Sequence, residues 1–455
     1  MILDDTIAAI ATPLGEGGLA VIRISGSQAL EIAERSFVAV GKTSVKPSAA
    51  PTHTIHYGKI LRHGKTVDEV LLAVMRAPRT FTREDVVEIS CHGGLLPAKM
   101  VLETILENGA RLATPGEFTK RAFLNGRIDL AQAEAVADLI HSRTELALAA
   151  ANEQLAGKLS QRINTLRDDM IKILAHVEAH IDFPDEDIAP DTKEKLISRL
   201  ESAANFMGEL LRTANEGQIL RRGIRAAIIG RPNAGKSSLL NQLLGRDRAI
   251  VSHIPGTTRD TIEETANIRG LPVIFIDTAG LREAGDEIEV EGIRRSRESL
   301  ASAEFILHVL DGSEPLTAAD EKFLAEFAAK KRILVRNKID LPPQLNLSPE
   351  IKTIDVCCVS GKGIESLKDQ IKNLIWSGEI KAEMLQVMIN SRHQEALARA
   401  CTATERTVSA LRENLTLELV ALDLRIATNA VGEIVGKTTT EDLLDSIFSQ
   451  FCIGK

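Results

Sequence analysis

Aromatic residues are scarce in this sequence, which has one Trp, one Tyr and 12 Phe among 455 residues. This scarcity excludes an aromatic-rich core, and we expect one built mostly from Leu, Ile, Val and Ala. With 44% hydrophobic and 26% charged residues, the composition is typical of a globular protein. A chain of this length is too long for one ordinary domain, and we expect about three.

Cysteine is also sparse, and its spacing excludes two classes of site. The five residues are Cys91, Cys357, Cys358, Cys401 and Cys452. Their number is odd and no Cys-x-x-Cys pair occurs, which argues against a disulfide framework and against a zinc ribbon. We therefore expect a reducing, cytoplasmic environment.

Long apolar runs are missing. None approaches the roughly 20 residues that span a bilayer, so we expect no membrane segment. Residues 1–5 are acidic and unlike a signal peptide, and residues 452–455 fit a prenylation signal poorly. The formal net charge of −8 argues against a protein that wraps nucleic acid over its whole surface. It leaves open RNA held on a local basic patch or by a partner.

The pattern of apolar residues changes along the chain. Residues 1–120 are mixed α/β, with short strands expected at 6–12, 20–25 and 86–90. From Leu130 onward a helical pattern dominates. Steps of three and four give one apolar stripe, formed by Leu155, Leu159, Ile163, Leu166, Met170, Ile173, Val177 and Ile181. A further helix is expected at 196–211.

A second change occurs at residue 222, where strands begin to alternate with helices. The strands are expected at 226–229, 273–276, 305–310 and 333–335, which is typical of a mainly parallel sheet. Helices resume after residue 378, at 384–410, 418–431 and 440–451. The sequence thus predicts a fold of α/β and α class. Its segments are an N-terminal α+β domain (1–120), a discontinuous helical domain (121–221 and 379–455) whose halves meet, and an inserted Ras-like G domain (222–378).

Residues 230–237, Gly-Arg-Pro-Asn-Ala-Gly-Lys-Ser, match the phosphate-loop pattern G-x-x-x-x-G-K-[ST]. An apolar strand precedes them and a helical run follows, as the motif requires. Backbone N–H groups of such a loop cradle phosphates, the lysine reaches the β- and γ-phosphates, and the serine binds Mg²⁺. The alternative is a glycine turn before a helix. The expected nucleotide contacts here are Asn233, Ala234, Gly235, Lys236, Ser237 and Ser238.

Two further motifs follow expected strands. Asp277, Thr278, Ala279 and Gly280 are placed for the Mg²⁺ shell and for sensing the γ-phosphate. Asn337, Lys338 and Asp340 follow the strand at 333–335, and Ser360 lies after another strand. The Asp340 carboxylate can accept hydrogen bonds from the N1–H and amine of guanine, which adenine cannot supply. We therefore predict that the nucleotide is GTP.

The segment between these motifs indicates how hydrolysis is arranged. Residues 255–260, Pro-Gly-Thr-Thr-Arg-Asp, carry a candidate Mg²⁺ ligand, Thr258, on a loop that changes with nucleotide state. Leu281 occupies the place where Ras-like enzymes have the water-orienting Gln. Another polar group must act, and the acidic run 283–289 is nearby, although such runs are commonly solvated. Residues 436–438 mimic the phosphate-loop tail, but we read them as a loop before a helix capped by Thr440.

These residues and the flanking segments resemble the MnmE (TrmE) family of tRNA-modification GTPases. The most specific stretches are 5–23, 114–118, 123–134, 256–260, 277–283 and 451–455. The resemblance implies an N-terminal domain that binds 5-formyl- or methylene-tetrahydrofolate and forms a homodimer. It implies an FAD-containing partner, MnmG, in a heterotetramer, and no membrane. It also implies K⁺-stimulated GTP hydrolysis coupled to aminomethyl or carboxymethylaminomethyl modification at C5 of the wobble uridine of certain tRNAs.

The same resemblance implies roles for particular residues. Glu289 would orient the hydrolytic water, and Cys452 would be the functional cysteine. The K⁺ ligands would be Asn233, Ser252, Ile254 and Thr257, and the nucleotide loop would also include His253, Pro255 and Gly256. The folate positions would be Arg23, Glu88, Arg127 and Lys455. From the residues alone, Arg23 and Arg127 can bind a carboxylate bidentately, although a surface Arg commonly does not.

Two other functions stay open at the level of sequence. The first is a regulatory GTPase that assembles ribosomes or signals without taking part in chemistry. Binding of a reduced folate by the first 120 residues would discriminate against it. The second is a dynamin-like GTPase, which needs a membrane-binding segment that the sequence does not offer.

Overall fold

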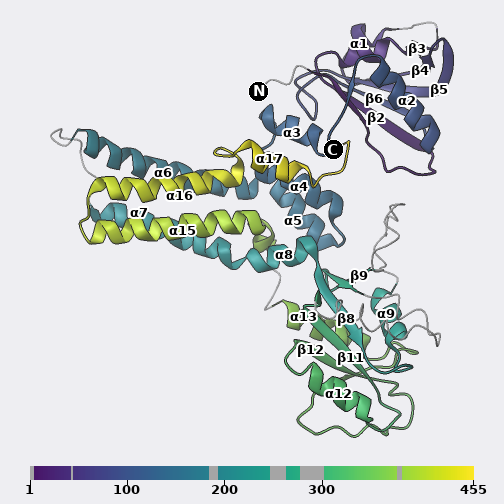
Figure 1. Ribbon diagram of the computed structural model, residues 1–455, viewed down its shortest axis with the longest axis vertical. Coiled ribbons are helices and arrows are strands. Elements are labelled where there is room, and N and C mark those ends of the chain that lie inside the picture. Colours follow the sequence, from purple (N-terminus) through teal and green to yellow (C-terminus); the bar gives the residue numbers. More distant parts are fainter. Residues whose placement is uncertain are drawn as a thin grey trace. The chain divides into compact units, whose positions relative to one another are not determined.

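The computed structural model describes residues 5–41, 45–183, 193–245, 263–276, 302–376 and 382–454 (Figure 1). The chain forms two compact units. The first comprises Met1–Ala137, Leu155–Ala203 and Arg399–Lys455, and the second comprises Asp138–Gln154 and Ala204–Ala398. Among the described helices, none is long and apolar enough to cross a membrane.

The first unit contains a seven-stranded sheet of order β3-β4-β5-β6-β2-β1-β7. Neighbouring strands are antiparallel except β1 and β7. The strands are β1 (Ile7–Ile10), β2 (Leu19–Ser25), β3 (Phe37–Ala39), β4 (Thr54–Arg62), β5 (Lys65–Met75), β6 (Val86–His92) and β7 (Arg111–Leu112). The predicted strands at 6–12, 20–25 and 86–90 are confirmed, although β1 is shorter than expected.

Two helices, α1 (Ala29–Glu34) and α2 (Leu95–Glu107), cover one face of this sheet (Figure 1). Alternate strand residues such as Ile22, Ile24 and Ile89 are buried against them. Because side chains alternate along a strand, Arg23 and Glu88 lie on the opposite face. The β4–β5 hairpin was not predicted. Its turn, His63-Gly64, has positive φ at both residues, which is typical of a two-residue hairpin turn.

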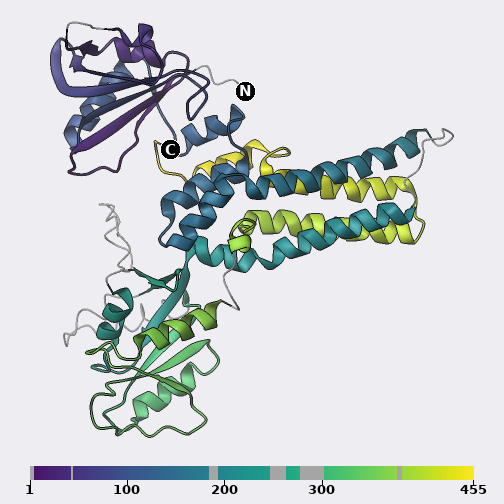
Figure 2. The same cartoon turned by 180° about the vertical axis from the view of Figure 1, so that it is seen from behind.

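The helices of the chain outside the sheets are bounded as follows. They are α3 (Glu117–Leu124), α4 (Leu130–His141), α5 (Glu145–Leu155), α6 (Lys158–Asp182), α7 (Lys193–Arg212), α8 (Ala214–Arg222), α14 (Ala382–Leu385), α15 (Ser391–Arg412), α16 (Leu417–Val435) and α17 (Glu441–Phe448). In the first unit α6 packs along α16, and the two helices lie side by side in both views (Figures 1 and 2). Helices from sequence positions on both sides of the G domain therefore meet.

Three helix predictions need correction. The stripe from residue 155 is not one helix, because α6 begins at Lys158 after Gly157 in a left-handed conformation. Its remaining apolar residues from 159 to 177 are buried as expected. The helix expected at 384–410 is interrupted at 386–390, because the Asn390 side chain accepts the His393 N–H at 2.8 Å and starts α15. The last helix ends at Phe448, three residues early, while its Thr440 cap is confirmed.

The second unit contains a six-stranded sheet of order β13-β12-β11-β8-β10-β9. The strands are β8 (Ile224–Ile229), β9 (Glu264–Ile268), β10 (Leu271–Phe275), β11 (Phe305–Asp311), β12 (Arg332–Asn337) and β13 (Thr353–Asp355). All described pairings are parallel except β9 with β10. The mainly parallel sheet is therefore confirmed, and its strands match the four predicted ones closely.

Helices cover both faces of this sheet. One core is formed by α9 (Lys236–Leu244) and α13 (Ile364–Ile375) against alternate residues of β8 and β11, including Phe305 and Val309. On the other face α12 (Ala318–Glu326) packs its Phe323 ring edge-on against His308, with centroids 6.3 Å apart. This arrangement brings the carboxyl ends of β8, β11 and β12 to one edge, where α/β folds place ligands.

Candidate functional site

The phosphate loop joins β8 to α9. Lys236 is the first residue of α9, and its Nζ donates to the carbonyl oxygens of Gly230 at 2.9 Å and Arg231 at 2.7 Å. Burial lowers the pKa of this lysine. Asn233 and Gly235 have φ of +64° and +95°, and a Cβ at residue 235 would collide with the Asn337 amide. The loop therefore curls around the lysine head, with a glycine where another chain segment touches it.

Asn337, the last residue of β12, ties three loops together. Its Nδ2 donates to Ala234 O at 3.0 Å, and its Oδ1 accepts from Cys358 N at 3.2 Å. The side chain of Gln242 in α9 also donates to Cys358 O, at 2.7 Å. The structure thus brings the phosphate loop, the Asn-Lys-x-Asp motif and the loop that contains Ser360 to one edge of the sheet.

The remaining predicted nucleotide residues within the described chain lie beside this clamp. Ser237 and Ser238 occupy the first turn of α9, and Asp340 and Ser360 are exposed on the adjoining loops. Burial, the neighbouring Cys357 and the Asp340 charge together raise the pKa of Cys358 to about 11. Ile339 N donates to Val356 O at 3.5 Å, which brings the turn that carries Asp340 beside the 357–360 loop. The expected residues 252–258, 277–280 and Glu289, with Thr258 among them, lie outside the described residues.

A second group of predicted residues meets on the first unit. Arg23 and Glu88 are register partners on β2 and β6, and Arg23 Nε donates to Glu88 Oε1 at 2.8 Å. Arg23 Nη1 also donates to Gly454 O at 3.2 Å. Gly454 has φ of +93°, and a Cβ there would lie 2.6 Å from Ile10 O. The carboxyl-terminal tail therefore lies on the sheet at the Arg23–Glu88 pair.

One small apolar cluster links this pair to Arg127. The cluster consists of Ile7, Ala9, Ala113 and Phe118, with Phe81 packed against it. The Arg23 guanidinium lies 5.7 Å from the Phe118 ring centroid, and that of Arg127 lies 4.9 Å from the Phe81 ring. Cation–π contact of this kind holds a guanidinium against a ring. Arg23 also donates to Glu88 and Gly454, and Arg127 Nη1 donates to Thr80 O at 3.3 Å, so a ligand would have to use their other N–H groups. Three of the four predicted folate residues thus converge; Lys455 lies outside the described residues.

Cys452 has an exposed side chain in the same tail, and its backbone carbonyl accepts from Gly116 N at 3.4 Å. Residue 116 has φ of +68° directly before α3, and a Cβ there would approach Phe448 O. The helices α3 and α17 pack together at this point (Figure 1). The thiol therefore sits on a tail that is held at its base rather than on a fraying end.

A buried ion network that sequence reasoning missed supports this region. Arg121 is 1% exposed and contacts Asp5, Glu84 and Glu117 at 2.6, 3.2 and 3.1 Å. Arg111 adds a bond to Glu117 at 2.6 Å. Burial alone would raise the pKa of Glu117, but hydrogen bonds from Arg111, the Thr114 backbone and Arg121 outweigh it and lower the pKa to about 2. The only signal of this network in the sequence is Glu117, which follows Pro115-Gly116 and begins α3.

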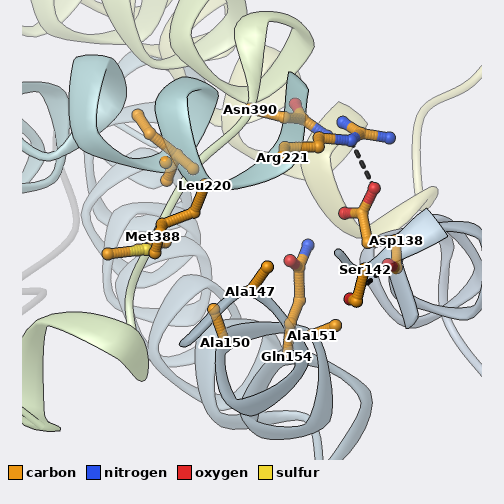
Figure 3. Close-up of a pocket in the computed structure, with 12 residues that line it drawn as sticks. Asp138, Ser142, Ala147, Ala150, Ala151, Gln154, Leu220, Arg221, Met388 and Asn390 are labelled. Carbon is orange, nitrogen blue, oxygen red and sulfur yellow. Dashed lines mark hydrogen bonds and ion pairs between the residues drawn. The ribbon is translucent and has the colours of Figure 1, made fainter. Parts of the chain in front are cut away.

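The second unit also contains a small cavity, whose lining includes none of the residues predicted for these sites (Figure 3). It is lined by α4, α5 and α8 residues and by Met388, Ile389 and Asn390, and an Asp138–Arg221 ion pair closes one side. Its volume of about 30 Å³ has room for roughly two water molecules and none for a nucleotide or folate.

A phosphate loop bonded to an Asn-Lys-x-Asp motif at the carboxyl edge of a mainly parallel sheet defines a P-loop protein of the GTPase class. Two family models match the chain: the GTP-binding protein TrmE N-terminus over residues 6–127 and the MnmE helical domain over residues 130–452. Similar curated proteins, each named "tRNA modification GTPase MnmE", occur in Geobacillus kaustophilus (48% identical, 99% of both chains), Listeria innocua (47%, 99% of both) and Clostridioides difficile (45%, 100% of both). The chain belongs to the MnmE family of tRNA modification GTPases.

Among solved structures, the G domain of the T. maritima FeoB iron transporter is similar over 34% of this chain and 99% of its own. The identity is 23% and the TM-score 0.25, too low to add to the assignment.

Proposed function

We propose that this protein binds and hydrolyses GTP at the carboxyl edge of the second sheet, as one step of tRNA modification. The observation that carries the proposal is the bond from Asn337 to the phosphate-loop carbonyl of Ala234, at 3.0 Å. It couples the base-reading motif to the phosphate loop in a chain 48% identical to proteins named tRNA modification GTPases. Lys236 would neutralise the β- and γ-phosphates, and Ser237 with Thr258 would hold Mg²⁺.

Base selection is assigned to Asp340, with Lys338 and Ser360 beside the base and Asp277 to Gly280 at the γ-phosphate. The test is Asp340→Asn. The new amide accepts poorly from guanine but pairs with the C2 oxygen of xanthine, so preference should move from GTP to xanthosine triphosphate by at least ~100-fold. Hydrolysis rates for both nucleotides measure this. An unchanged GTP preference would show that Asp340 does not read the base.

Activation by K⁺ is proposed to use Asn233 with Ser252, Ile254 and Thr257. Asn233 is exposed in the phosphate loop with φ of +64°, and its side-chain oxygen can serve as a ligand for a cation. A monovalent cation there supplies the positive charge that an arginine finger supplies in other GTPases. Glu289 is proposed to orient the attacking water, since Leu281 cannot.

The folate site is proposed at Arg23, Glu88, Arg127 and Lys455. The guanidinium groups of Arg23 and Arg127 lie over the Phe118 and Phe81 rings. Their N–H groups that do not bond Glu88, Gly454 or Thr80 suit the carboxylates of a reduced folate. When bound, the folate would supply a one-carbon unit. Cys452, on the tail bonded to Arg23, is proposed to lie beside the folate. With an FAD-containing partner, MnmG, the product would be an aminomethyl-type group at C5 of the tRNA wobble uridine.

Homodimerisation is proposed through the sheet face opposite α1 and α2. Ile55, Tyr57 and Leu71 are 69%, 48% and 44% exposed on that face. They continue across the strand registers into the Arg23–Glu88 pair. A second copy of the chain would cover this apolar surface. We also propose that the chain is divided into segments 1–120, 121–221, 222–378 and 379–455. The proposed location of the protein is the cytoplasm.

A further inference from the structure

Residues 311–320 run from the end of β11 into α12 and belong to none of the GTPase motifs in the sequence. The segment begins with Asp311, the last residue of β11, and ends with Asp320 in the first turn of α12. Both carboxylates are buried, at 4% and 2% exposure. A buried carboxylate requires partners, and for both residues the cationic partner belongs to the nucleotide site.

The first attachment is to the base-reading motif. Asp311 Oδ2 accepts from Lys338 Nζ at 2.6 Å, and its Oδ1 accepts from the N–H and hydroxyl of Ser313 at 3.0 and 2.6 Å. Although burial alone would raise the pKa of Asp311, these bonds lower it, so the carboxylate is charged. Gly312 N also donates to Asn337 O at 2.8 Å, an approach that a Cβ would obstruct.

The second attachment is to the phosphate loop. Arg231 Nε lies 3.0 Å from Asp320 Oδ2, an ion-pair distance without hydrogen-bond alignment, and its Nη2 lies 3.0 Å from Glu314 Oε2. Thr317 and Asp320 form the capping box of α12, which holds the carboxylate in place. The carbonyl of the same Arg231 accepts from Lys236 Nζ at 2.7 Å. The segment thus holds a residue that itself contacts the phosphate-binding lysine.

We propose that residues 311–320 act as a clasp that sets the distance between the phosphate loop and the base-reading motif. Asp311 is the positioning residue for Lys338 and the following Asp340, and Asp320 with Arg231 positions Lys236. The inference rests on the proposed binding of a guanine nucleotide at this edge. A nucleotide must reach both parts at once, so a site already held at the right span loses less entropy on binding.

The test compares dissociation constants of the full chain for GDP and inosine diphosphate. Inosine diphosphate lacks the exocyclic amine from which Asp340 is proposed to accept a hydrogen bond. Asp311→Asn should loosen the turn that carries Asp340, and should lower the preference for GDP over inosine diphosphate at least ~3-fold. Asp320→Asn, which keeps a capping side chain, should weaken both ligands about 10-fold with an unchanged preference, since only phosphate contacts suffer.

Glu326→Gln is the matched control, because it removes the same charge from the exposed far end of α12 and should alter neither constant. Emission of Trp376, the only Trp and 2% exposed in the same unit, reports correct folding. If the emission spectrum shows that a variant is unfolded, a milder substitution on the same attachment replaces it. Ser313→Ala replaces Asp311→Asn, and Arg231→Lys replaces Asp320→Asn. Each should change the dissociation constants in the same direction as the variant that it replaces.

Two results would overturn the clasp. In the first, correctly folded variants of both attachments keep both constants within twofold of wild type. In the second, both attachments weaken the two ligands equally with no change of preference, which would make the segment a general stabiliser. Failure of the proposed function is distinct, because the wild-type chain would then bind neither diphosphate.

Discussion

The two candidate sites of this molecule are built in different ways. The nucleotide site of the second unit is made mostly of contiguous motifs, each on a loop that follows one strand, and much of its geometry comes from backbone. The site at Arg23 is assembled from single side chains of β2, β6, the 80–81 segment, α3 and the carboxyl-terminal tail. Backbone loops recur as recognisable strings, whereas a site assembled by strand register leaves no local pattern.

The comparison also predicts that the two sites can be disabled separately. They belong to different compact units, and no residue is shared between them. Variants in one site should therefore leave the other's ligand affinity unchanged, and the following predictions test that separation from the largest expected effect to the smallest.

Cys452→Ser should abolish tRNA modification and leave GTP hydrolysis within about twofold of wild type. The thiol is exposed on the tail bonded to Arg23, and a hydroxyl is a far weaker nucleophile near neutral pH. The measurements are modified wobble uridine in tRNA from cells with only the variant, and GTP turnover of the purified protein. Full modification would disprove a role for the thiol; loss of both activities would require a folding control.

Glu289→Ala should affect the nucleotide site instead of the tail. It should slow GTP hydrolysis about 100-fold while GTP affinity is retained. A group that acts on the water only in the transition state lowers kcat without weakening ground-state binding. Single-turnover rate and nucleotide affinity are measured on one preparation. A rate within about threefold of wild type corresponds to a change of less than ~0.7 kcal/mol in the activation free energy. It would show that Glu289 is only a solvated residue of the acidic run 283–289.

Arg23→Ala should weaken binding of 5-formyl-tetrahydrofolate about 10- to 30-fold, the worth of one charge-assisted hydrogen bond, with GDP affinity unchanged. Arg62→Ala is a matched control. Arg62 is also paired with Glu, and its side chain is 24% exposed against 20% for Arg23. Calorimetric titration of both variants decides the matter. Equal losses in the two would mean that the folate site is elsewhere.

Glu117→Gln should lower the stability of the α3 region by about 2 kcal/mol at pH 7, with both activities intact at 25 °C. The folded pKa of about 2 lies below the ordinary 4.5. The contribution is therefore complete above pH 4.5 and is lost as pH falls toward 2. The whole pKa shift would correspond to about 3 kcal/mol. The expected loss of stability is smaller, because the partner Arg111 is 44% exposed and solvent screens its charge. Hydrogen-exchange protection of α3 measures it, and a wild-type–variant difference that is undiminished at pH 2 would contradict it.

Sequence reasoning succeeded where local pattern and backbone chemistry coincide. The strands at 226–229, 273–276, 305–310 and 333–335 and the Thr440 cap were predictable, because apolar runs and cap residues act over a few positions. It failed where a local signal was overridden or absent. Asn390 interrupts a helical pattern by capping the next helix. The β4–β5 hairpin turns at His63-Gly64, which is not one of the dipeptides that commonly signal a two-residue turn.

What the sequence by itself determined was the presence of a phosphate-loop pattern and an Asn-Lys-x-Asp motif, because each is a contiguous run of residues after a single strand. Tertiary structure alone decided that Arg23 meets Gly454, 431 positions away, and that Asp311 and Asp320 reach Lys338 and Arg231. The physical reason is that a charged side chain can be buried only beside its counter-ion, and the fold, through strand register and helix packing, brings those distant partners together.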